Sequence, residues 1–233
     1  MNPLVENLLI NKNTFDIREY DYYLFDFDMT LFDTTEPASL SYKAAFAAID
    51  VIYDETAIGA YLSEFLTDTF CRICKDESRY KIFEDTFYSE SHKHMSNANI
   101  YSDVRVTLDT LKKKEKKIAI VTNKDAIAVE LILKTHGFTK TFFDSIVTCE
   151  MIKNRKPAPD ALLLCIEDLK AKDTLGGESA KIVYIGDAPN DIYAARNARI
   201  DTFLLNRQGN EKMDGVLSIY SLENLIEIYK EGM

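Results

Sequence analysis

Hydrophobic and polar residues follow two patterns along this chain: short apolar runs typical of buried strands, and longer segments with helical spacing between them. Most segments between the strand candidates repeat apolar residues at helical spacing, as in 125–138 and 160–170. Strands that alternate with helices favour an α/β fold with a doubly wound, mostly parallel sheet. The runs expected to form buried strands are YYLFDF (22–27), KKIAIVT (116–122), DSIVT (144–148), KIVYIG (181–186) and DTFLL (201–205).

The stretch between the first two strands is far longer than one crossover helix requires. Residues 35–98 are helical in period and rich in Phe and Tyr, which predicts a small helical domain inserted into the sheet domain. We therefore expect a core domain of residues 1–34 and 99–233 and a helical cap domain of residues 35–98. The first 20 residues carry no pattern that predicts a role.

Length and charge narrow the classes of function. The 233 residues are 46% hydrophobic, enough for one sizeable core. Asp and Glu number 38 against 28 Lys and Arg, and the net charge of −10 argues against a nucleic-acid partner. No apolar run reaches the roughly 18 residues of a membrane span, so we expect no membrane partner and a cytoplasmic location. The sequence does not indicate an oligomeric state.

Polar side chains gather where the expected strands end. Ligands of open parallel sheets bind beyond the carboxyl ends of the strands, so residues at these points matter most. Gly186 permits a tight turn there, and two prolines fix the backbone after the lysine of KNRKPAPD. The side chains expected at this edge are Asp26, Asp28, Thr122, Asn123, Lys156, Asp187 and Asp191.

The acids at this edge would repel one another unless a cation lay among them. Hard oxygen ligands favour Mg²⁺, and a metal held by Asp26 and Asp187 keeps a carboxylate ionised at neutral pH. Asp26 can then act as a nucleophile, while Asp28 exchanges protons with a leaving group and with water. Asp191 is either a partner of this site or a helix N-terminal acid.

The remaining polar groups suit a phosphoryl group. Thr122 and Asn123 offer donors and Lys156 offers one positive charge, which match an anion whose charge is spread over three oxygens. The sequence therefore predicts catalytic roles for Thr122 and Lys156 and phosphate binding by all three residues.

Four motifs in order resemble those of the haloacid dehalogenase superfamily of hydrolases. They are the DxDxT of 26–30, the strand-end Thr122, Lys156 in KPAPD, and the GDAPND that holds Asp187 and Asp191. The motifs cover nearly the whole chain. The insert after the first strand makes the chain similar to the subgroup that carries a helical cap at that place. The resemblance implies a Rossmann-like core with a helical cap and a phosphatase similar to phosphoglycolate phosphatase.

The resemblance also implies roles for the acids. Asp26 attacks phosphorus to form an aspartyl-phosphate, and Asp28 first protonates the leaving alcohol and then activates water. Mg²⁺ contacts the Asp26 carboxylate, the backbone carbonyl of Asp28 and the Asp187 carboxylate, while Asp191 holds neighbours of the metal without touching it. Met29 stands where relatives usually carry Gly, so we expect a loop backbone that suits a side chain. The substrate is a small phosphoester whose identity the sequence does not indicate.

Three alternatives compete with the phosphatase interpretation. A phosphosugar mutase similar to β-phosphoglucomutase shares Asp33, Thr34 and KPAPD, but mutases of this kind carry a histidine where this chain has Ala38. Without that histidine we expect Asp28 to be free to activate water at once, as in a hydrolase. A signalling receiver domain would place its acceptor on a middle strand, and a degenerate scaffold would have lost one of the motif residues.

Overall fold

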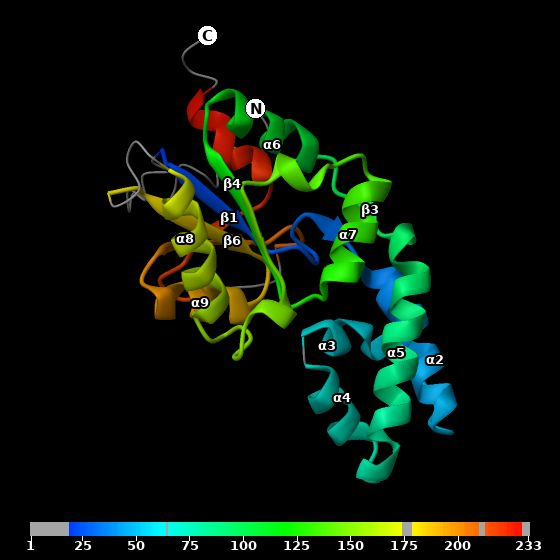
Figure 1. Ribbon diagram of the computed structural model, residues 1–233. Coiled ribbons are helices and arrows are strands. Elements are labelled where there is room, and N and C mark those ends of the chain that lie inside the picture. Colours follow the sequence, from blue (N-terminus) through cyan, green and yellow to red (C-terminus); the bar gives the residue numbers. More distant parts are fainter. Residues whose placement is uncertain (1–18, 64, 174–178, 210–212, 230–233) are drawn as a thin grey trace.

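A six-stranded parallel sheet forms the centre of the computed structural model, which describes residues 19–63, 65–173, 179–209 and 213–229 (Figure 1). Nearly all of the N-terminal extension lies outside these ranges. The strand order is β5-β4-β1-β6-β7-β8, and every neighbouring pair is parallel. The strands are β1 (Tyr22–Phe25), β4 (Lys117–Val121), β5 (Ser145–Val147), β6 (Ile182–Gly186), β7 (Asp201–Leu205) and β8 (Leu217–Ile219). All five predicted strands are confirmed. Strand β8 is an addition, since its sequence LSI is interrupted by a serine and only Ile219 is buried.

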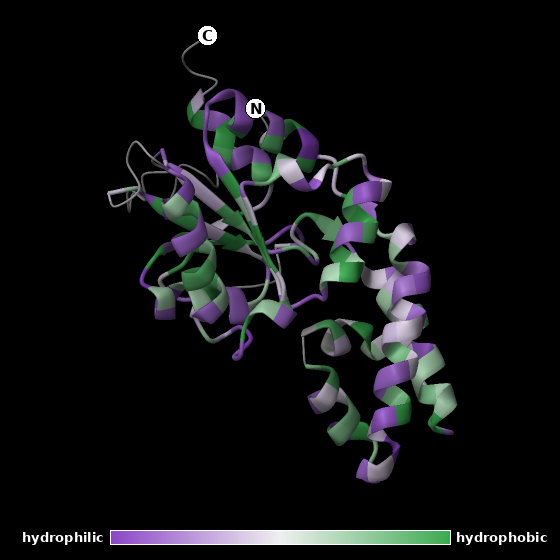
Figure 2. Ribbon diagram, in the orientation of Figure 1, coloured by the Kyte–Doolittle hydropathy of each residue, from purple (hydrophilic) through white to green (hydrophobic). Residues whose placement is uncertain are grey.

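Helices cover both faces of the sheet, which confirms the doubly wound α/β fold. One face is covered by α6 (Val104–Lys113), α7 (Ala126–Thr135) and the 3₁₀ helix η6 (Leu222–Tyr229), and the other by α8 (Asp160–Lys172) and α9 (Pro189–Ala198). Short 3₁₀ helices η4 (Lys140–Phe142) and η5 (Cys149–Met151) flank β5. Figure 2 shows the apolar strands enclosed by helices whose outward positions are hydrophilic.

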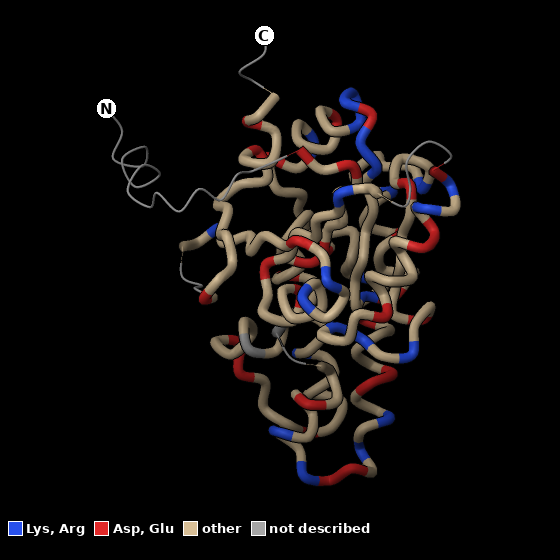
Figure 3. Tube along the Cα trace, turned by 90° about the vertical axis from the view of Figure 1, so that its left-hand side faces the viewer, with Lys and Arg blue, Asp and Glu red and all other residues tan. Residues whose placement is uncertain are grey.

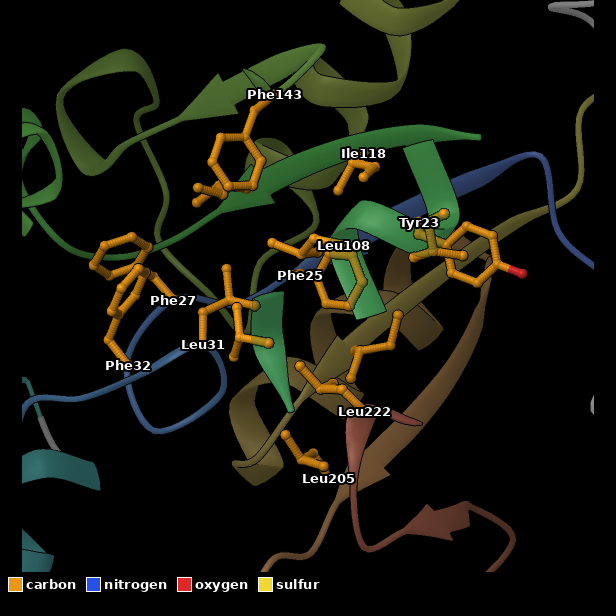
Figure 4. Close-up of a cluster of buried hydrophobic side chains, with 14 of the residues drawn as sticks. Tyr23, Phe25, Phe27, Leu31, Phe32, Leu108, Ile118, Phe143, Leu205 and Leu222 are labelled. Atoms are coloured by element: carbon orange, nitrogen blue, oxygen red, sulfur yellow. The ribbon is translucent and has the colours of Figure 1, made fainter. Parts of the chain in front are cut away.

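The two faces take alternate residues of each strand, as the pleat of a strand requires. On β1, Tyr23 and Phe25 face the α6 side, whereas Tyr22 and Leu24 face the α8 side. Figure 4 shows Phe25 packed with residues from β4, α6 and η6 on the first face, with Phe27 extending the same apolar cluster beyond the strand end. Burial on both faces explains why β1 is a continuous apolar run.

Residues 35–97, here called the helical segment, gather on one side of the sheet core (Figure 1). Helices α2 and α5 lie side by side and enclose an aromatic cluster that includes Tyr42, Phe46, Phe70 and Phe83. The helical period and the many Phe and Tyr residues of this stretch thus correspond to helices that pack around buried rings. The elements of this segment are α2 (Thr35–Ala48), η1 (Glu55–Ala57), α3 (Ile58–Ser63), α4 (Leu66–Ile73), η2 (Glu77–Arg79), α5 (Tyr80–His94) and η3 (Met95–Asn97).

The helical segment is joined to the core by a two-stranded antiparallel ribbon. Strand β2 (Phe32–Asp33) leads into α2, and β3 (Asn99–Ile100) follows η3, with Asp33 opposite Asn99. A further contact joins the two parts where Nε2 of His92 on α5 lies 2.9 Å from Oδ1 of Asp125, the N-cap of α7. The division into a core domain and a cap domain stays a prediction.

Charged residues are interspersed over the molecule. In the view of Figure 3, basic and acidic positions alternate along both the sheet core and the helical segment. Lys112 and Lys113 lie in the last turn of α6, where positive charge complements the partial negative charge of the helix end. Within the ranges that the structure describes, no helix has the length and apolar character needed to cross a membrane.

Candidate active site

The candidate site lies where the winding of the sheet reverses. From β1 the sheet continues through β4 and β5 in one direction and through β6, β7 and β8 in the other, so the switch point of the sheet, where ligands of such folds bind, lies at the carboxyl end of β1. Asp26 follows β1, Thr122 follows β4 and Asp187 follows β6. Residues that are 65 or more positions apart in the sequence therefore meet at one edge of the sheet.

The ammonium of Lys156 is the centre of a buried network. Its Nζ lies 2.6 Å from Oδ1 of Asp26, 2.6 Å from Oδ1 of Asp191 and 2.8 Å from the hydroxyl of Tyr184. Only 3% of the Lys156 surface is exposed. Burial alone lowers the pKa of a lysine, but the carboxylates of Asp191 and Asp26 outweigh it and raise the pKa of Lys156 above its usual range. The lysine is therefore positively charged at neutral pH.

Three acids converge beside this lysine. Oxygen atoms of Asp26, Asp187 and Asp191 all lie within 4.8 Å of one another. Burial, together with the charge of Asp191, raises the pKa of Asp26 to about 7. Burial and the neighbouring carboxylates also raise the pKa of Asp187 well above its usual range. One lysine does not neutralise three carboxylates, so the site fits a hard divalent cation, which would keep them ionised.

Asp191 differs from the other two acids because protein donors occupy both of its oxygens. Oδ1 accepts from Lys156 and from the Tyr184 hydroxyl at 3.0 Å, and Oδ2 accepts from the backbone N–H of Ala188 at 3.1 Å. This last bond closes the first turn of α9. The arrangement fits the place predicted for Asp191, which is to hold neighbours of a metal rather than the metal itself.

Asp28 lies at the same edge of the sheet, but its carboxylate contacts Thr34 and Lys124 rather than Lys156. Its Oδ1 accepts a hydrogen bond of 2.6 Å from Thr34 Oγ1 and lies 3.1 Å from Nζ of Lys124. These two contacts hold the Asp28 carboxylate in this structure, and the expectation that Asp28 is free to activate water at once stays a prediction. Lys124 escaped the sequence analysis although it follows Asn123 directly, because a lysine after a strand looks like an ordinary solvated residue.

Thr30 links the first loop to two distant segments. Its Oγ1 donates to Oδ1 of Asp187 at 3.0 Å, and its carbonyl accepts from Arg207 at 2.8 Å. Thr30 is fully buried. These contacts hold the loop after β1 against the strand ends of β6 and β7.

Met29 adopts a backbone conformation that the sequence analysis did not anticipate. Its φ is +55°, in the left-handed region, so the expectation of a backbone suited to a side chain is wrong. The turn imposes this angle because the Met29 N–H donates to the carbonyl of Phe32 at 2.7 Å. A left-handed non-glycine residue costs roughly 1–2 kcal/mol. The Met29 sulfur lies 3.6 Å from Thr35 Oγ1 and 3.9 Å from the Tyr101 hydroxyl.

The polar residues after β4 brace the neighbouring loop. The Asn123 side chain accepts from the Lys156 N–H at 3.1 Å and donates to the Lys156 carbonyl at 3.4 Å. Thr122 is buried, and its Oγ1 accepts from the backbone N–H of Lys124 at 3.1 Å. The Asn123 amide thus positions the loop that carries Lys156. Binding of phosphate by Thr122 and Asn123 stays a prediction.

Comparison with known families identifies the chain as a hydrolase. It belongs to the haloacid dehalogenase-like hydrolase family, whose model matches residues 23–205 and so includes the whole stretch from Asp26 to Asp191. The resemblance drawn from the four motifs is confirmed, and with it the class of enzyme, a phosphatase of this superfamily.

Individual relatives carry two different names. The chain is 31% identical over 186 residues to pyrophosphatase PpaX of Halalkalibacterium halodurans, covering 79% of this chain and 82% of that protein. It is 29% identical over 195 residues to phosphoglycolate phosphatase of Vibrio parahaemolyticus, covering 77% and 80%. The structure of CbbY from Rhodobacter sphaeroides in complex with phosphate is similar in fold, with a TM-score of 0.75 at 20% identity over 89% of this chain and 96% of that chain.

Proposed function

We propose that this protein is a Mg²⁺-dependent phosphatase that hydrolyses a small phosphomonoester through an aspartyl-phosphate. The observation that carries the proposal is the buried lysine that bridges Asp26 and Asp191 beside Asp187, at the switch point of the sheet. A charged donor next to a carboxylate nucleophile suits a phosphoryl group, which needs positive charge and an attacking oxygen on one side.

Asp26 is the proposed nucleophile. One of its carboxylate oxygens attacks phosphorus as the bond from phosphorus to the leaving oxygen breaks, and the Asp28 carboxyl gives its proton to that oxygen. Asp28 then removes a proton from water, whose oxygen attacks the phosphorus of the acyl phosphate as the bond from phosphorus to Asp26 breaks. This step releases inorganic phosphate, restores the Asp26 carboxylate and leaves on Asp28 the proton for the next leaving group. Thr34 and Lys124 hold the Asp28 carboxylate before reaction, so a shift away from these partners belongs to the proposed cycle.

Thr122, Asn123 and Lys156 are the proposed phosphate ligands, and the Asn123 side chain also bonds to the backbone of Lys156. Asp26, the Asp28 carbonyl and Asp187 are the proposed metal ligands. The bound Mg²⁺ would neutralise the developing charge on the phosphoryl oxygens and hold the acids ionised.

The helical segment is proposed to act as a cap that selects the leaving group. A cleft of 520 Å³ lies between it and the loop that carries Lys156, lined by Tyr80 and Tyr88 of α5 and by Arg155 and Pro157 of the loop. That volume lies in the range that holds small ligands. Arg155 and Pro157 flank Lys156 in the chain, although the buried Lys156 side chain does not itself line the cleft.

The experiment that tests the proposal is a panel of phosphoesters, including phosphoglycolate, assayed with Mg²⁺ and after its removal by a chelator, ranked by kcat/KM. We expect hydrolysis of at least one small ester that disappears without metal and returns when Mg²⁺ is added. Turnover that is unaffected by complete metal removal would exclude the proposed metal role.

Inorganic pyrophosphate is a second candidate substrate, favoured by the 31% identity to pyrophosphatase PpaX. The same panel separates it from phosphomonoesters by the ranking of kcat/KM. Ala38, buried at the start of α2, supports hydrolysis over the mutase alternative because a methyl group offers no hydrogen bond to control an acid. Accumulation of glucose 6-phosphate from β-glucose 1-phosphate and a trace of the bisphosphate, faster than inorganic phosphate appears, would favour the mutase instead.

A further inference from the structure

Tyr184 lies beneath the candidate site with its whole surface buried. It occupies the middle of β6, in the run KIVYIG, where the neighbouring strand positions are aliphatic. Its ring packs in the cluster on the α8 and α9 face of the sheet, next to Leu24 of β1 in the ladder. A phenylalanine would fill the same space, so the hydroxyl needs a separate explanation.

The Tyr184 hydroxyl completes the coordination of the lysine. It lies 2.8 Å from Nζ of Lys156, 3.0 Å from Oδ1 of Asp191 and 3.0 Å from the carbonyl of Val121. A lysine ammonium has three N–H donors, and the three short contacts of Lys156 are Asp26, Asp191 and Tyr184. The hydroxyl accepts a hydrogen bond from the third N–H of Lys156. It donates its own hydrogen to the carbonyl of Val121 or to the carboxylate of Asp191.

A flexible lysine between two carboxylates has no fixed position of its own. Its four-carbon stem leaves the ammonium free to move toward either acid. The Tyr184 hydroxyl is a neutral acceptor that belongs to β6 and is hydrogen-bonded to β4. It fixes the direction of one Lys156 N–H, and the directions of the other two N–H groups follow from the geometry of the ammonium. The carbonyl of Val121 alone, at 3.5 Å from Nζ, is too distant to do this.

We infer that Tyr184 is a positioning residue for the phosphoryl-transfer step: its hydroxyl holds the Lys156 ammonium against Asp191 and against Asp26, the proposed attacking carboxylate. This inference rests on the proposed function. Tyr184 does not touch the reacting atoms and acts only through Lys156.

The test compares Tyr184→Phe with Tyr22→Phe, which is a matched control. Tyr22 lies on the neighbouring strand, is equally buried in the same cluster, and donates to the carboxylate of Asp173 at 2.7 Å away from the site. We expect both variants to fold and to lower Tm by similar amounts. For Tyr184→Phe we expect kcat to fall roughly 10-fold with KM within about twofold, by analogy with the loss of a preorganised contact. Tyr22→Phe should keep kcat within about twofold.

A second comparison uses a Lys156→Ala background, in which kcat is expected to be roughly 10²-fold lower. There, adding Tyr184→Phe should cause no further fall in kcat, since the hydroxyl has no ammonium left to hold. Equal kcat in Tyr184→Phe and Tyr22→Phe, the same fall in both backgrounds, or failure of Tyr184→Phe alone to fold would each overturn the inference. A wild-type protein without metal-dependent hydrolysis would instead overturn the proposed function.

Discussion

The sheet core and the helical segment are stabilised by different means. The core buries charged groups at one edge, where Lys156 and three acids are compressed beside a fully buried threonine, Thr30. The helical segment buries rings: Phe46 contacts Phe83 at 5.0 Å between centroids, and Tyr42 contacts Phe87 at 4.7 Å. Its charged pairs lie on the surface, where each contributes little to stability.

The sheet core and the helical segment should therefore tolerate different kinds of amino-acid substitution. A buried network of charges depends on the identity of every member, because removal of one partner leaves another unpaired. An aromatic cluster depends mainly on volume and shape. Substitutions should therefore affect chemistry in the core and packing in the helical segment.

The largest effect is expected for Asp26→Asn, which should lower kcat by roughly 10⁴-fold or more because an amide is not a nucleophile. Steady-state assays with the best substrate of the panel give the measurement, and the Tm of the variant verifies folding. Asp54→Asn is the control from the helical segment, where Asp54 is exposed and caps η1, and it should stay within about twofold of wild type. Turnover of Asp26→Asn above a tenth of the wild-type rate would exclude the aspartyl-phosphate.

Phe46→Ala should lower the free energy of unfolding of the helical segment by about 3–5 kcal/mol, because Phe46 is fully buried among rings. If this segment unfolds separately, hydrogen exchange should speed up in α2 and α5 while β1 and β4 keep their protection. Phe25→Ala, from the core, should instead expose the whole sheet to exchange. A uniform loss of protection in Phe46→Ala would show that both parts unfold as one.

Asp103 links three core segments, and Asp103→Asn should cost about 1–3 kcal/mol at neutral pH. Its carboxylate accepts from Arg207 at 2.8 and 3.0 Å and from Ser221 Oγ and the Leu222 N–H, each at 2.8 Å. Burial acts to raise the pKa of Asp103, but these hydrogen bonds and the charge of Arg207 outweigh it and hold the pKa below its usual range.

A carboxyl whose pKa is lower in the folded state stabilises the protein above its unfolded pKa of about 4, and this stabilisation is lost as the pH falls through the folded value. Urea unfolding between neutral and acidic pH should therefore show a shallower pH dependence for Asp103→Asn than for wild type. Asp85→Asn, at an exposed pair on α5, is the control and should follow the wild-type curve. Identical slopes for Asp103→Asn and wild type would contradict the assignment.

The smallest effect is expected for His92→Ala, which removes one contact between the two parts. The His92 and Asp125 side chains are 31% and 14% exposed, so the pair should contribute about 0.2–1 kcal/mol to the free energy of unfolding. His94→Ala, whose partner Glu90 lies on the same helix, serves as the control. A cost above about 2 kcal/mol would mean that this contact locks the helical segment to the core.

The sequence was sufficient for five of the six strands of the sheet, because buried parallel strands are continuous apolar runs, as in the run that ends at Val121. It also indicated the acids, whose spacing at strand ends is unusual. It was insufficient for Tyr184, because a tyrosine in a strand has the same pattern whether its hydroxyl serves packing or a lysine 28 positions away. The left-handed angle of Met29 was equally hidden, since it arises from a turn bond to Phe32 rather than from the residue itself.

The short ribbon of β2 and β3 explains how the segment between these strands can vary in length during evolution. The chain leaves the core at Asp33 and returns directly opposite at Asn99, and opposed residues of an antiparallel pair have Cα atoms about 4.5–5.5 Å apart. The core thus closes on itself whatever number of residues lies between these two points. Residues between these two points can therefore be inserted, removed or exchanged without a change in the register of the six-stranded sheet, so this stretch of the gene can vary in length while the sheet stays the same.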